Sequence, residues 1–197
     1  MNSYAKAETL VGAFAAPLDW TRSAVAVVGF SLLTALAAQV AVPLPWTPVP
    51  LTGQTFAVLL TGALLGPRLG ALAMLAYLAE GAMGLPFFRG GAGGVGHLSG
   101  ATAGYLFAFP AAAYVTGALA VRGWDRRYLP AAAAMALGSF VILGCGWAWL
   151  ASAVGGAQAF RLGVAPFLAG DVVKIALAAA ALPAGWALLR RLDARGE

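Results

Sequence analysis

Long apolar stretches dominate this chain between residues 21 and 189, and short segments rich in proline, glycine or charge separate them. Runs of about 20 apolar residues are typical of helices that cross a membrane. The pattern therefore predicts an all-α, polytopic membrane protein, with a single membrane domain over residues 1–197 and six transmembrane helices. We expect these helices at residues 23–42, 54–65, 69–83, 100–121, 129–154 and 166–189.

The second and third of these segments are short for an apolar layer about 30 Å thick, which favours tilted, kinked or incompletely spanning helices. Residues 1–22 mix polar and apolar side chains and have no signal-peptide cleavage pattern, so we interpret them as a cytoplasmic lead-in. Residues 84–104 are expected to form a glycine-rich loop on the outer side.

Basic residues are distributed unevenly between the two sides that this topology defines. If both termini are cytoplasmic, nine Lys and Arg residues lie on the cytoplasmic side and two lie in outer loops. Such a bias sets orientation in membranes, and it predicts cytoplasmic termini in a multi-pass protein of a bacterial plasma membrane. The nine are Lys6, Arg22, Arg68, Arg122, Arg126, Arg127, Arg190, Arg191 and Arg195, and the two are Arg89 and Arg161.

Composition supports the membrane class and excludes several others. The chain is 61% hydrophobic and 10% charged, whereas charged residues make up about a quarter of an ordinary soluble domain. Its net charge of +5 follows from the loop arginines, with no basic patch interleaved with aromatics, and we expect no nucleic-acid partner. The single cysteine, Cys145, and the single histidine, His97, provide neither a disulfide framework nor a zinc site.

Two charged residues lie within the last apolar segment, where charge is expensive. A central Asp or Lys in a membrane helix costs about 2.5–3.5 kcal/mol on insertion scales, and such residues usually serve function. Asp171 and Lys174 are three residues apart and therefore share one helix face. A carboxylate beside an ammonium suits a small polar ligand. The alternative is an ion pair that only satisfies itself.

A proline-rich stretch, VPLPWTPVPLTGQTF at residues 42–56, precedes the second helical segment. Its prolines exclude a helix, and Thr52 or Thr55 is expected to cap the helix that follows. Gln54 lies at that entrance, where its amide either contacts a ligand or satisfies the loop.

The glycine-rich loop reads GLPFFRGGAGGVGHLSGATAG and contains eight glycines. Glycine lets the backbone approach a ligand closely and direct N–H groups toward it, and Gly91 and Gly94 are candidates for this role. We expect a flexible outer cover over the site. Arg89 either pairs with a substrate carboxylate or anchors the loop at the headgroups, and His97 is expected to pack within the loop.

Glu80 is the third charge within an apolar segment, and Tyr77 lies one turn earlier on the same helix face. Both are candidates for the wall of a binding cavity, although Glu80 alternatively meets the interface at the end of its helix.

Three sequence blocks together resemble one family, BioY, the biotin-specific substrate-capture (S) component of energy-coupling-factor (ECF) transporters. They are VPLTGQTFAVLLTGALLGPRLGALAMLAYLAEGAMGLPFF, GATAGYLFAF and PFLAGDVVK. The resemblance implies six helices without ATPase activity, with biotin bound near the outer surface under loops. It also implies that Asp171 and Lys174 contact the ureido ring of biotin and that the glycine-rich loop closes the site.

The chemistry of a cyclic urea agrees with this assignment. Its two N–H groups can donate to Asp171, and its carbonyl can accept from Lys174; each charge-assisted hydrogen bond is worth about 1.5–3 kcal/mol. The ring sulfur and the acyl chain need apolar and aromatic walls. Candidates for these walls are Tyr77, Phe87, Phe88 and Tyr105.

No phosphate-binding GxxxxGK[ST] motif is present, so we expect no ATP hydrolysis, no catalytic residues and no cofactor. The resemblance implies a transmembrane coupling subunit and ABC-type ATPases as partners. Ala37 and Ala41 have the small-xxx-small spacing that allows close helix contact, and we expect the coupling subunit there. Other hypotheses are capture of another vitamin, an integral-membrane enzyme, and a complete transporter or channel.

Overall fold

The computed structural model describes residues 9–15 and 19–196, which are mostly helical. The helices are α1 (Leu10–Ala15), α2 (Trp20–Gln39), α3 (Gln54–Leu65), α4 (Pro67–Ala82), α5 (Ala103–Ala120), α6 (Tyr128–Val154), α7 (Gly156–Gly163) and α8 (Ala165–Gly196). Strand β1 (Ala41–Val42) pairs antiparallel with β2 (Leu51–Thr52), and short 3₁₀ turns form η2 (Arg89–Gly91), η3 (Val95–Ser99) and η4 (Trp124–Arg126).

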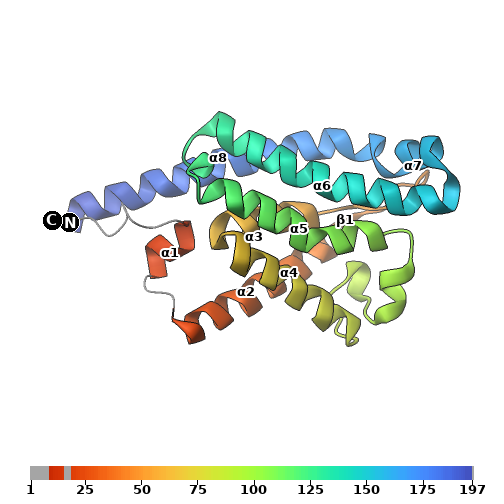
Figure 1. Ribbon diagram of the computed structural model, residues 1–197, viewed down its shortest axis with the longest axis horizontal. Helices are drawn as coiled ribbons and strands as arrows, with labels where there is room; N and C mark the ends of the chain where they lie inside the picture. Colours follow the sequence, from red (N-terminus) through yellow and green to blue (C-terminus); the bar gives the residue numbers. More distant parts are fainter. Residues whose placement is uncertain (1–8, 16–18, 197) are drawn as a thin grey trace.

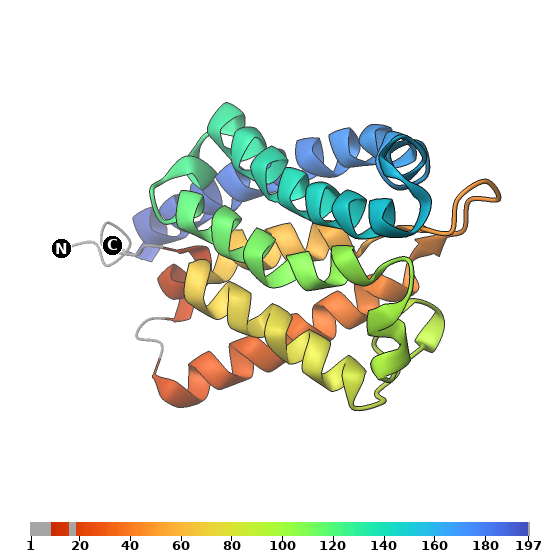
Figure 2. The same cartoon turned by 45° about the vertical axis from the view of Figure 1, so that its right-hand side comes forward.

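The long helices lie side by side along the long axis of the molecule (Figure 1). Helix α5 is central: it lies between α6 and α4 in Figure 2 and also packs against α3. The contact between α3 and α5 requires a glycine, because a Cβ atom at Gly62 would lie only 2.2 Å from the carbonyl oxygen of Ala113. The hairpin β1–β2, the loop between α4 and α5, and α7 gather at one end of the bundle (Figure 1).

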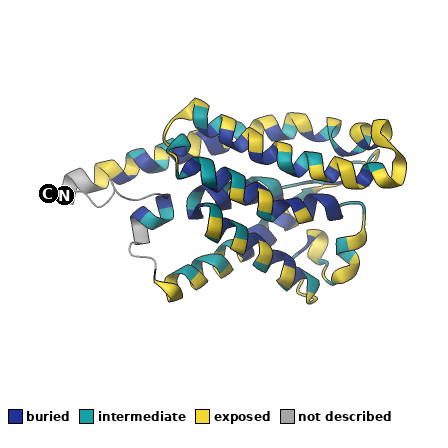
Figure 3. Cartoon of the chain, viewed as in Figure 1, coloured by how far each residue is buried: buried dark blue, intermediate teal, exposed yellow. Residues whose placement is uncertain are grey.

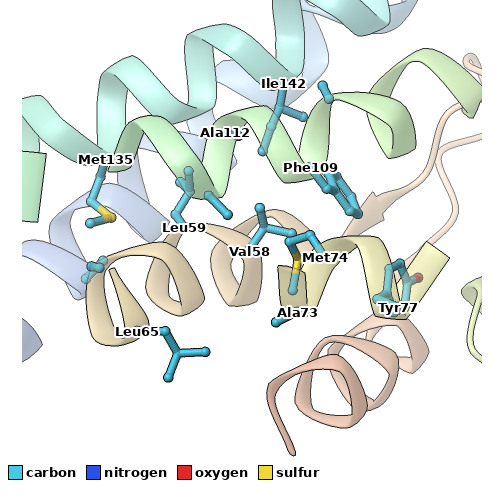
Figure 4. Packing of buried hydrophobic residues seen from close by; sticks show 14 of the residues in the cluster. Val58, Leu59, Leu65, Ala73, Met74, Tyr77, Phe109, Ala112, Met135 and Ile142 are labelled. Atoms are coloured by element: carbon cyan, nitrogen blue, oxygen red, sulfur yellow. The ribbon is translucent and has the colours of Figure 1, made fainter. Parts of the chain in front are cut away.

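Apolar side chains from α3 to α6 fill the centre of the bundle. Val58, Met74, Phe109, Met135 and Ile142 are each at most 2% exposed, and Figure 4 shows them converging from four helices. By contrast, many large apolar residues of α2, α6 and α8 are exposed, and Figure 3 shows exposed positions along these helices. An apolar surface of this kind is expected where helices face lipid.

The predicted all-α membrane class is confirmed in its coarse form. Each predicted helical segment corresponds to a helix, and α2, α5, α6 and α8 are long and apolar enough to cross a membrane. Helices α3 and α4 are shorter, with 12 and 16 residues, as their short apolar segments indicated. The number of spans and the cytoplasmic position of the termini stay predictions.

The segment expected as a lead-in includes α1, whose Leu10 is buried, and its cytoplasmic position stays a prediction. Two local expectations were wrong. Helix α2 ends at Gln39, which places Ala41 in β1, so Ala37 and Ala41 do not form a helical pair. Helix α3 has Gly53 as its N-cap with no side-chain capping bond, because the neighbouring threonine hydroxyls bond elsewhere.

Candidate substrate-binding site

A cavity of about 690 Å³, including its open mouth, lies at the end of the bundle near the hairpin. Its walls come from the hairpin, the glycine-rich loop, and helices α3, α5, α6 and α8. The lining residues are Val49, Pro50, Thr52, Gln54, Thr55, Phe88, Arg89, His97, Thr102, Tyr105, Leu106, Phe109, Leu143, Phe167, Asp171 and Lys174.

Asp171 and Lys174 both line this cavity from the first turns of α8. Lys174 Nζ lies 3.6 Å from Asp171 Oδ1, and the two side chains are only 16% and 9% exposed. The i, i+3 spacing within α8 places them on one face, as the sequence indicated. A nearly buried ion pair therefore lies in the cavity wall.

Two hydroxyl groups from other helices complete the polar cluster. Lys174 Nζ donates to Thr55 Oγ1 of α3 at 2.8 Å, and Ser139 of α6 donates to Asp171 Oδ2. The residues bonded in this way are separated by 119 and 32 positions along the chain. The cluster therefore ties three helices together beside the cavity.

Asp171 and Lys174 can form hydrogen bonds to a ligand that carries both donors and acceptors. Asp171 has two oxygens and Lys174 has three donor hydrogens, so each has more bonding capacity than its protein partners use. Both groups form an ion pair with each other, yet they also face the cavity. Their ion pair and the hydrogen bonds to Thr55 and Ser139 stabilise them without a ligand, and their position at the cavity allows a ligand to compete for these contacts.

Gln54 also lines the cavity, and a chain of hydrogen bonds fixes its amide. Thr52 donates to Gln54 Oε1 at 3.0 Å, and Gln54 Nε2 donates to the Tyr77 hydroxyl at 2.5 Å. The Tyr77 hydroxyl donates in turn to the carbonyl oxygen of Phe87 at 3.2 Å. Tyr77 is completely buried beneath the cavity wall, where it supports Gln54 and the start of the glycine-rich loop.

Aromatic side chains form much of the apolar wall. Phe88 lines the cavity and stacks on His97, with ring centroids 5.7 Å apart. Tyr105 lines another side and donates its hydroxyl hydrogen to the carbonyl oxygen of Gly163 at 2.7 Å. That bond links the cavity to α7. Phe87, a predicted wall residue, stacks on Tyr77 and is not among the lining residues.

The remaining candidates lie around or behind the cavity. Arg89 is exposed at its lining, whereas Gly91 and Gly94 use their N–H groups within the fold. Gly91 donates to Gln39 Oε1 at 2.9 Å, and Gly94 donates to the carbonyl oxygen of Gly81 at 2.7 Å. Glu80 accepts a 2.7 Å hydrogen bond from Ser31 on α2, and the structure does not bring it to the cavity.

Sequence reasoning missed the partners of the central ion pair. Ser139 is one of few polar residues in the apolar helix α6, and this isolated hydroxyl was a usable signal. Thr55 was considered only as a helix cap. Within the described part of the chain, no group of three His, Cys, Asp or Glu residues is arranged to hold a metal ion.

Comparison with known proteins links this chain to one family. A sequence model of the BioY family matches residues 5–191. The "Probable biotin transporter BioY" of Pyrococcus horikoshii is 46% identical over 149 residues, which cover 76% of this chain and 86% of that protein. The "Biotin transporter BioY" of Rhodobacter capsulatus is 36% identical over 182 residues, covering 85% and 86%.

A solved structure shares the fold. It is the "S-component for biotin from an ECF-type ABC transporter", with a TM-score of 0.74 and 22% sequence identity. The match covers 88% of this chain and 91% of that chain.

Proposed function

The chain belongs to the BioY family, and from this premise we propose that it is a membrane protein that captures biotin for uptake. The proposed site is the cavity beside Asp171 and Lys174. Relatives of this chain are named as biotin transporters, which favours transport over an enzymatic role. The observation that carries the proposal is the ion pair of α8 in the wall of a cavity lined by polar and aromatic side chains.

The polar cluster matches the ureido group of biotin. Asp171 can accept hydrogen bonds from the two ureido N–H groups, and Lys174 can donate to the ureido carbonyl. Thr55 and Ser139 hold the two charged groups in place from neighbouring helices, which reduces the entropy that binding must remove. Gln54 adds an amide that its own hydrogen-bond chain keeps oriented.

The apolar part of biotin has matching walls. Phe88, Tyr105, Phe109 and Phe167 line the cavity and can contact the ring sulfur and the acyl chain. Arg89 lies exposed at the same cavity, and its guanidinium geometry suits the terminal carboxylate. We therefore place the ureido end beside α8 and the carboxylate end beside η2.

Concentrative uptake needs energy, because binding shifts an equilibrium only by the difference in affinity between two states. We propose that a transmembrane coupling subunit and ABC-type ATPases supply it. The exposed apolar face of α2, which includes Val25, Leu32 and Leu36, supports a contact surface beside Ala37. Ala41 lies beyond the end of this helix, in β1.

A reconstitution experiment tests the proposal. The purified protein in nanodiscs is titrated with biotin, thiamine and riboflavin, and the same protein alone in liposomes is assayed for biotin accumulation. We expect saturable binding of biotin only and no accumulation. Preference for another vitamin would reject biotin as the substrate, and accumulation without partners or an ion gradient would reject the capture role.

A further inference from the structure

The end of α2 is connected to the glycine-rich loop by one side chain, that of Gln39. Its Nε2 donates to the carbonyl oxygen of Phe88 at 3.2 Å and to that of Ala35, in its own helix, at 3.0 Å. Its Oε1 accepts the N–H of Gly91 at 2.9 Å. Both amide hydrogens and the oxygen are therefore used, and the contacts to Phe88 and Gly91 determine which way the amide is oriented.

The two groups that Gln39 binds lie on either side of Arg89. The loop closes on itself here, because the Phe88 N–H donates to the carbonyl oxygen of Ala92 at 2.9 Å. Gly90 and Gly91 have φ angles of 70° and 71°, a conformation that favours glycine. Gln39 therefore bonds to the backbone at both sides of a tight turn and holds that turn close to the end of α2.

Arg89 depends on this turn for its position. Among the residues that the structure describes, no side chain forms a hydrogen bond or ion pair with its guanidinium group. Phe88, on the same turn, is 1% exposed and lines the cavity. The backbone to which Gln39 is bonded therefore carries both a cation and an aromatic ring at the cavity, although Gln39 itself does not line it.

We propose that Gln39 is a positioning residue for the ligand: it holds the 88–92 turn over the cavity and slows ligand release without touching the ligand. The inference rests on the proposed function for the identity of the ligand, but the mechanical link itself does not. Two hydrogen bonds to the turn would be lost without the amide, and the turn would open more often.

The test compares three variants in nanodiscs. Q39M keeps the length of the side chain and removes its hydrogen bonds, and Q39E keeps an acceptor for Gly91 but cannot donate to Phe88. Q158M changes an exposed glutamine of α7 and is the matched control. We expect Q39M to raise the biotin dissociation rate about tenfold, Q39E less, and Q158M not at all, with association rates little changed.

A double variant separates positioning from general destabilisation. If Gln39 acts through Arg89, Q39M should change the dissociation rate much less in an R89A background than in the wild type. Equal effects in both backgrounds, or a wild-type dissociation rate in Q39M and Q39E, would overturn the proposal.

Hydrogen exchange of the ligand-free protein tests the link independently of biotin. We expect faster amide exchange in residues 88–92 for Q39M and Q39E, and wild-type exchange for Q158M. Unchanged exchange would overturn the proposal. Faster exchange in a protein that does not bind biotin would instead reject the proposed substrate and retain Gln39 as the residue that holds the turn.

Discussion

Two buried carboxylates near opposite ends of the bundle have different surroundings. Asp171 lies in a cavity wall and forms an ion pair with Lys174 through one carboxylate oxygen, while Ser139 donates a hydrogen bond to the other oxygen. Asp125 lies in η4 and is 1% exposed. It accepts a 2.6 Å hydrogen bond from the indole N–H of Trp186, and its Oδ1 has no partner among the described residues.

The surroundings determine what each carboxylate can do. Arg126 lies over the Trp186 ring at 4.6 Å, so Asp125, Trp186 and Arg126 form a packed cluster between η4 and α8. Burial raises the pKa of Asp125, opposed by the hydrogen bond from Trp186 and the charge of Arg126. A carboxylate beside a cavity can exchange partners with a ligand, whereas one enclosed by packing can only stabilise the fold. The contrast therefore supports the proposal that Asp171 binds the ligand, whereas Asp125 stabilises the fold.

The largest effect is expected from Lys174→Met, which removes the cation of the cavity pair and keeps an unbranched side chain. Asp171 would remain nearly buried without its charged partner. Breaking a buried pair in this way lowers the free energy of unfolding by about 3–5 kcal/mol. We expect biotin affinity, measured by calorimetry, to fall more than about a hundredfold. Arg161→Gln, at an exposed site in α7, is the control, and equal affinities would show that the pair is purely structural.

Exchanging each carboxylate for an amide tests the contrast directly. Asp171→Asn should weaken biotin binding by about 1.5–3 kcal/mol, the scale of a charge-assisted hydrogen bond. Asp125→Asn should leave affinity within about twofold of wild type, because distant sites without shared partners act independently. Titrations of both variants decide the matter, and the comparison fails if Asp125→Asn is the more damaging of the two for binding.

Trp186→Phe removes the hydrogen-bond donor of Asp125 and leaves most of the packing. We expect a loss of about 1–3 kcal/mol in the free energy of unfolding, because the buried carboxylate loses the hydrogen bond that the indole N–H supplies. Thermal unfolding in detergent measures this, and biotin titration of the folded variant should match wild type. A loss of affinity without a loss of stability would connect this cluster to the binding site.

The smallest effect concerns pH. Since burial raises the pKa of Asp125 above its usual 3.8, the folded state holds this proton more tightly than the unfolded chain. The resulting stability is present below pH 3.8 and is lost as pH rises through the folded-state pKa. The Asp125→Asn variant has no titrating group at this position. The thermal-unfolding midpoint of the wild type, relative to that of this variant, should therefore fall from pH 4 upward. A relative midpoint that rises with pH would show that the folded state favours the carboxylate.

Several features were predictable because they depend on residue type and local order. Asp171 and Lys174 stand out because charge is costly in an apolar helix, and their shared face follows from helical geometry. The helical segments follow from hydropathy, and prolines mark the connection between α2 and α3. The three family blocks, residues 49–88, 100–109 and 166–174, also include most of the residues that line the cavity.

Other features needed the packed structure. Glu80, like Asp171, is one of the few charged residues within an apolar segment. It nevertheless accepts a hydrogen bond from Ser31 on α2 and does not line the cavity. Tyr77 supports the wall from beneath, and Ala41 leaves the helix that would have placed it beside Ala37. In each case the sequence singled out an unusual residue but did not show which side chains it contacts in the folded protein.

The sequence by itself determined the membrane class, the approximate position of each helix, the family and the two charges in the wall of the candidate site. Only the tertiary structure decided which face of each helix meets the cavity and which polar groups become partners, such as Thr55, Ser139 and Gln39. The physical reason is that these helices are apolar on nearly all faces, so hydropathy does not indicate their rotation. Rotation is set by packing and by hydrogen bonds between residues as much as 119 positions apart.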